Sequence, residues 1–112
     1  MITSYTTPSH DNLAAHVGHE FVVVPEPCRL VAGTVLVLEA VSTPWEHGGS
    51  AEFEARFTGP LWEDLQPDFY RLRTRLTVFA LHLEPVARDA RFVHYVATLT
   101  DVTCAEATPL AG

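Results

Sequence analysis

Histidines are the residues of this chain that are best suited to metal chemistry, and there are six of them in 112 residues. His16 and His19 have the spacing that places two imidazoles on one face of a helix, with His10 nearby. Gly18 interrupts the expected helix between them, and no Cys-x-x-Cys or His-Glu-x-x-His pattern adds ligands. We therefore expect solvent-exposed histidines, no metal site and no cofactor.

Two carboxylates, Glu52 and Glu54, share one face of an alternating segment and could do general acid–base work if burial separated their pKa values. Arg56 follows on the same face, and alternating arginines occupy residues 71–75. We interpret these charges as a solvent-exposed ladder across two strands rather than as a catalytic pair.

Other combinations of catalytic residue types are weaker. His47, Ser50 and Asp64 lack a Gly-x-Ser-x-Gly elbow, and the chain has no glycine-rich phosphate loop. His82 and His94 lie on neighbouring expected strands, where they could face each other in a pH-sensitive contact. The sequence is thus more consistent with a noncatalytic protein than with an enzyme.

Composition narrows the classes of partner. The formal net charge is −7, with seven arginines and no lysine, which disfavours binding to nucleic acid or to an anionic membrane. There is no apolar run of about 18 residues and no basic, apolar leader, so we expect a cytoplasmic protein. In that reducing compartment Cys28 and Cys104 are expected to be free thiols.

The elements that must position these residues are mostly strands. Pro8 and a Thr7 or Ser9 cap open a short helix that ends at Gly18. The expected strands are 20–24, 34–41, 51–58, 69–73, 76–84 (ended by Pro85) and 92–100, with a loop at 42–50. This predicts a mostly β fold, a small antiparallel barrel or sandwich of about six strands with one short N-terminal helix. Residues 1–8 are expected to be a flexible arm, 9–101 a single β domain and 102–112 a flexible tail.

The strands expected at 20–24, 34–41 and 92–100 carry apolar residues on both faces, and one short helix cannot cover all three. A second sheet layer or another subunit must cover the remainder, and we expect some of each. We therefore expect self-association, with a homodimer as the simplest form, and expect Val23→Asp to dissociate it without unfolding the chain. Trp45 and Trp62, in expected loops, either join this interface or plug the barrel ends. The interface candidates are Trp45, Trp62, Phe21, Val23, Leu36, Leu38 and Tyr95.

A hollow barrel is the alternative. It would bind an apolar ligand, as a small cyclase- or isomerase-like enzyme does. Its candidate lumen residues are Tyr70, His94, Phe53, Phe57 and Phe79. A core filled by interlocked aromatic rings favours the structural protein, whereas a dry pocket of about 300 Å³ or more favours ligand binding.

Several segments together resemble a bacterial domain-of-unknown-function family of this size. They are residues 17–21 (VGHEF), 38–41 (LEAV), 53–60 (FEARFTGP), 65–72 (LQPDFYRL), 79–85 (FALHLEP) and 95–97 (YVA). The chain departs from the family pattern at Asp68, where glycine is usual, and in a shorter segment at 72–76. The resemblance implies no catalytic residue. It implies a setting beside phage-tail-collar-like fibre proteins, hence a protein partner in a tail-fibre-like or secreted assembly.

Overall fold

The computed structural model describes residues 9–24, 33–62, 65–75 and 77–100. The elements are α1 (His10–Ala14), β1 (Glu20–Val23), β2 (Val35–Val41), β3 (Trp45–His47), β4 (Ser50–Gly59), β5 (Asp68–Arg73), β6 (Val78–Arg88) and β7 (Val93–Thr100). The expected N-terminal arm and C-terminal tail lie outside these residues, as do Cys28 and Cys104. Within the described part of the chain, no helix is long and apolar enough to cross a membrane.

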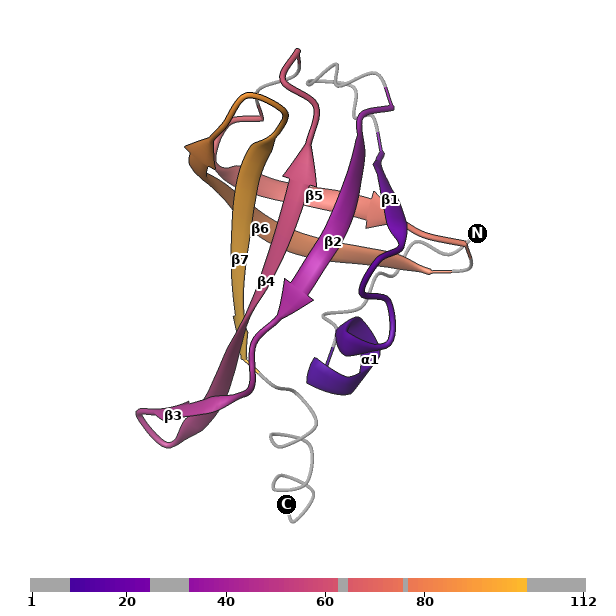
Figure 1. The fold of residues 1–112 in the computed structure, drawn as a ribbon. Coiled ribbons are helices and arrows are strands. Elements are labelled where there is room, and N and C mark those ends of the chain that lie inside the picture. The colour runs from indigo at the N-terminus through magenta and orange to yellow at the C-terminus, as the bar shows by residue number, and fades with distance from the viewer. Residues whose placement is uncertain (1–8, 25–32, 63–64, 76, 101–112) are drawn as a thin grey trace.

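The strands form a closed antiparallel barrel (Figure 1). Their order is β2-β1-β5-β6-β7-β4-β3, and a further pairing of β2 with β4 closes six strands into a ring, leaving β3 as an extension. Each pairing is antiparallel. The mostly β fold with one short helix is confirmed, and it takes the barrel form rather than the sandwich.

Alternating side chains fill the interior of the barrel. In β4, Phe53, Ala55 and Phe57 are buried, whereas the residues between them face outward. Barrels with this few strands are narrow enough for side chains to fill. The aromatic members of the core are Phe21, Phe53, Phe57, Tyr70, Phe79 and Tyr95.

Leucines close the barrel ends. At one end α1 inserts Leu13 into the core, and the His10 ring packs edge-on against Phe53 at 5.2 Å. At the other end Leu65, from the connection between β4 and β5, is buried in the core. The helix begins at the expected cap, since the Ser9 side chain accepts a hydrogen bond from the Asn12 N–H at 3.2 Å.

Two strands differ from the sequence-based expectation. The loop expected at 42–50 contains β3, which forms a hairpin with β4 because Gly48 and Gly49 adopt φ values of 62° and 87°. Positive φ at both central residues is what a two-residue hairpin turn needs. β6 does not end at Pro85. It continues to Arg88 through an irregularity between Pro85 and Ala87, which is where a sheet tolerates proline.

The expected charge ladder between Glu52, Glu54 and the arginines of 71–75 is wrong. β4 pairs with β2, β3 and β7, whereas β5 pairs with β1 and β6, so the two charged strands are not neighbours. Glu54 lies opposite Thr98, and its nearest cation is Arg56 of the same strand at 3.5 Å. Period-two patterns reveal the outer face of each strand but not which strands are adjacent.

Candidate functional site

Five of the seven expected interface residues lie inside the barrel. Phe21, Val23, Leu36, Leu38 and Tyr95 are at most 1% exposed, so they cannot contact a partner and this part of the interface prediction is wrong. β1 begins with the exposed Glu20, and the alternation that follows places Phe21 and Val23 inward. The closed ring of strands covers the inward faces of these strands, whereas Val35 on the outer face of β2 stays 38% exposed.

The two tryptophans, unlike those five buried residues, are exposed to solvent. Trp62 is 73% exposed and Trp45 is 40% exposed, so neither side chain plugs a barrel end. Leu13 and Leu65 do that instead. The Trp62 indole therefore projects into solvent just after the end of β4.

An apolar groove lies beside Trp62 on the outer surface of the barrel, near the end that is uppermost in Figure 1. Its volume is about 260 Å³, and none of its lining residues carries a charge. The lining residues are Gly33, Val35, Val37, Thr58, Gly59, Pro60, Trp62 and Phe92. Phe92 and Val35 are each 38% exposed. We call this surface the Trp62 groove; the sequence had pointed to it only through Trp62 itself.

Two interior tyrosines hold the segment that follows Trp62. The Tyr95 hydroxyl accepts a hydrogen bond from the buried Leu65 N–H at 3.1 Å, and the Tyr70 hydroxyl donates one to the Gln66 carbonyl at 2.7 Å. Beneath the groove, Gly59 lets the Tyr95 ring and the Leu36 side chain approach, since a β-carbon there would lie 2.6 Å from Leu36. The core therefore holds Gly59, before Trp62 in the chain, and Leu65 and Gln66, after it.

We expect Tyr95→Phe to destabilise the protein by about 1–3 kcal/mol, because the buried Leu65 N–H would lose its acceptor. Tyr70→Phe is the matched control. Gln66 is exposed, so water can replace the lost hydroxyl and the cost should be smaller. Urea unfolding of both variants measures the difference, and an equal or smaller loss for Tyr95→Phe would contradict this role.

A tight turn between β6 and β7 positions Phe92 at the groove. The Asp89 carboxylate accepts hydrogen bonds from the His94 ring at 2.7 Å and from the backbone N–H groups of Arg91 and Phe92 at 2.7 and 2.9 Å. These hydrogen bonds, that from His94 foremost, lower the pKa of Asp89 from 3.8 to about 2. The Arg91 guanidinium lies 5.6 Å from the centre of the Phe92 ring.

The lowered pKa of Asp89 predicts a pH dependence of stability. A carboxyl with a pKa below its unfolded value stabilises the fold at pH above about 4, and this contribution is lost as pH falls towards about 2. The difference in urea midpoint between wild type and Asp89→Asn should therefore shrink over that interval. A difference that stays constant down to pH 2 would refute the linkage.

The expected lumen residues separate into two groups. Phe53, Phe57, Phe79 and Tyr70 lie inside the barrel, at most 4% exposed. His94 faces outward to Asp89, so its placement in a lumen is wrong.

The contact of His82 with His94 that the sequence allowed does not form, because the register between β6 and β7 places His94 opposite Ala87, five residues from His82. His82 packs against Phe69 of β5 instead, with ring centroids 4.9 Å apart.

No catalytic or metal arrangement emerges from the described residues. Among them there is no group of three or more His, Cys, Asp or Glu side chains placed to hold a metal ion. His16 and His19 do lie together, with ring centroids 5.4 Å apart, but without a third ligand. Asp64 of the Ser–His–Asp combination lies outside the described residues.

Fold and groove together define a small, closed antiparallel β-barrel domain with an exposed, uncharged aromatic surface. Residues 8–99 match the model of a family described as a domain of unknown function, DUF6916, and the chain belongs to that family. No curated protein and no solved structure matches it.

Proposed function

We propose that this protein is a noncatalytic structural or interaction component, and that the Trp62 groove is its contact surface. The observation that carries the proposal is the Trp62 indole, 73% exposed beside an uncharged apolar groove. Exposing an indole and its apolar surroundings to water is unfavourable, and burying them against a partner recovers that free energy. Tryptophan is also among the side chains that contribute most to protein interfaces.

A second copy of the chain is the partner that fits this surface. A two-fold interface uses the same patch on both subunits, so the patch must be complementary to itself. The Trp62 groove offers both a protruding indole and an apolar hollow. Although each chain carries a net charge of −7, none of that charge lies on the groove lining, so the repulsion between two copies is not concentrated there.

The filled barrel interior favours this function over the alternative of a ligand-binding barrel or a cyclase- or isomerase-like enzyme. Phe21 meets Phe57 edge to face at 5.6 Å and contacts Phe79 at 6.3 Å, so these rings occupy the centre where a ligand would bind. The open groove, at about 260 Å³, is also smaller than the usual range for small-molecule pockets.

The setting that we propose is a cytoplasmic, bacterial one, in which the protein is accessory to a tail-fibre-like or secreted assembly. The family resemblance supports it. In that setting the exposed aromatic surface would contact a fibre-like protein once assembly begins, and the homodimer would be the form that protects the groove beforehand.

Sedimentation equilibrium tests the proposed dimer. Wild type should be dimeric at roughly 100 μM, and Trp62→Ser should weaken dimerisation by about 30-fold or more, as expected for a central aromatic residue. Phe69→Ser is the matched control, since Phe69 is 63% exposed on β5, which is not adjacent in the barrel to the strands that form the groove. A monomeric wild type, or equal weakening by both substitutions, would contradict the proposal.

A further inference from the structure

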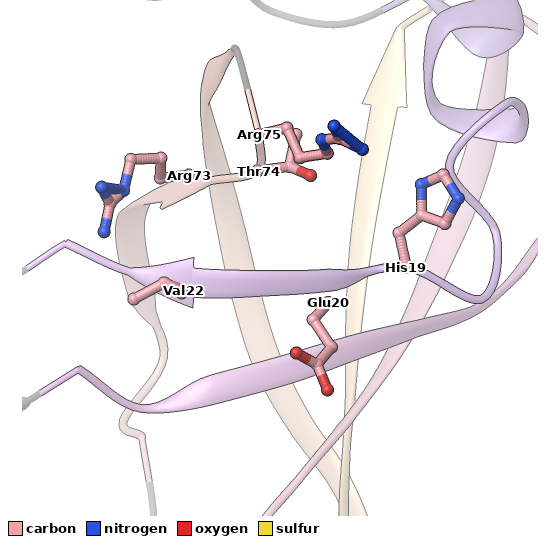
Figure 2. Close-up of a pocket in the computed structure, with 6 residues that line it drawn as sticks. All are labelled: His19, Glu20, Val22, Arg73, Thr74 and Arg75. Carbon is pink, nitrogen blue, oxygen red and sulfur yellow. The ribbon is translucent and has the colours of Figure 1, made fainter.

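A second cleft opens where two barrel strands separate. Among the described residues, β1 and β5 pair through Val22 with Arg73 and Val23 with Leu72, and the Val24 N–H donates a hydrogen bond to the Arg71 carbonyl at 2.9 Å. On the His19 side the pairing stops at Val22. Beyond it the strands diverge and leave a cleft of about 480 Å³, shown in Figure 2. Its lining residues are His19, Glu20, Val22, Arg73, Thr74 and Arg75.

The cleft continues towards α1. A neighbouring hollow of about 330 Å³ shares His19, Thr74 and Arg75 with it and adds His16 and Thr77. A hydrogen bond from the Thr74 N–H to the Thr77 carbonyl, at 2.9 Å, fixes the turn that carries Arg75. The two hollows therefore form one continuous surface, with its shared residues at the centre.

The shared residues are hydrogen-bond donors that suit an anion. Figure 2 shows the Arg75 guanidinium and the His19 ring extending towards each other across the gap, with the Thr74 side chain at the base of Arg75. The Glu20 carboxylate points to the other side of the β1 ribbon. A guanidinium and a hydroxyl supply the N–H and O–H groups that bind carboxylate or phosphate oxygens.

The two arginines of the cleft have no acidic partner in the part of the chain that the structure describes. Within the described residues, no ion pair or hydrogen bond engages the side chain of Arg73 or Arg75, although the chain carries fourteen acidic residues against seven arginines. Arg56, by contrast, has Glu54 as a partner. Arg73 and Arg75 outnumber Glu20, the carboxylate that lines the cleft, although Figure 2 shows the Arg73 side chain extending away from Arg75.

We propose that this cleft binds a small ligand through an oxyanion, a carboxylate or a phosphate group. Arg75 and Thr74 contact the oxyanion directly, His19 closes one side, and Arg73 adds charge from β5. The apolar side chain of Val22 accommodates the uncharged part of the ligand. This site is independent of the Trp62 groove, which shares no residue with it.

Titration with inorganic phosphate and, separately, with acetate tests the site, with amide chemical shifts as the readout. We expect saturable shifts at residues 19 and 73–75 with at least one of the two anions. The anion that binds more tightly distinguishes phosphate from carboxylate ligands. Arg75→Gln should weaken binding about tenfold or more, the usual loss for a charged hydrogen bond. Arg56→Gln, which removes the same charge from β4, should change it less than about twofold.

Three outcomes would overturn the proposal. One is the absence of saturable shifts with either anion, and another is equal weakening by the two variants, which would indicate general attraction to positive charge. The third is a set of shifts centred away from the cleft. Arg75 and Arg56 are both exposed, so both variants should fold, and their amide spectra report folding in the same experiment.

Discussion

Val23→Asp should unfold the protein. Val23 is fully buried in the barrel core, and aspartate there would either hold an unpaired charge in an apolar environment or bind a proton at the cost of a strongly raised pKa. We expect a loss of about 4 kcal/mol or more, a large part of the 5–15 kcal/mol that typically stabilises a domain. Circular dichroism and urea unfolding measure it.

Val22→Asp provides the matched control for that substitution. Val22 is the neighbouring residue of the same strand, but it faces outward, and Arg73 lies opposite it in register. The same change should therefore cost about 1 kcal/mol or less. A folded, monomeric Val23→Asp protein would instead support the expectation that Val23 faces a partner, and would contradict the barrel described here.

Phe57→Ala should have the second largest effect on stability. The ring is 1% exposed and meets Phe21 edge to face at 5.6 Å in the centre of the barrel. Truncating a buried phenylalanine typically costs about 3–5 kcal/mol, because contacts are lost and a cavity remains. We expect a lower urea midpoint with an unchanged slope, as for a loss of stability without a change in the area exposed on unfolding.

Phe69→Ala separates the effect of burial from that of removing a ring. Phe69 lies on the outer face of β5 and is 63% exposed, so its removal should change stability by less than about 1 kcal/mol. Similar losses for Phe57→Ala and Phe69→Ala would mean that the interior is not packed as the structure describes.

Much of the fold could be predicted from local sequence. Alternation in 51–57 gave the inward face of β4 correctly, because charged residues mark the outward side. Ser9 marked the start of α1 through capping, but the helix ends at Ala14, four residues before the expected end at Gly18, which has a φ of 91°. The Gly48-Gly49 pair carried the signal for the β3 hairpin, but no long apolar alternation preceded it.

The contacts between strands that were predicted wrongly depend on the order and register of the strands, which local patterns do not encode. The charge ladder assumed that β4 and β5 are neighbours, which they are not, whereas the His82–His94 contact assumed the right neighbours, β6 and β7, in the wrong register. Glu20 in β1 and Glu39 in β2 mark the outward faces that also carry Val22, Val35 and Val37. The two strands were instead taken as apolar on both faces, so Phe21 and Leu38 were assigned to an interface while Val35 and Val37 were not. The oxyanion cleft likewise joins His19 and Arg75, which only the pairing of β1 with β5 brings together.

The most direct test of the account is whether Trp62 becomes buried when the protein associates. Trp45 and Trp62 are the two tryptophans of the chain, so Trp45→Phe leaves Trp62 as a single fluorescent reporter. Its emission should move to shorter wavelength as protein concentration rises through the monomer–dimer transition, and it should become less accessible to a soluble quencher. Emission that remains that of a solvent-exposed indole at every concentration, including any at which the protein is dimeric, would contradict the assignment of the Trp62 groove as the contact surface.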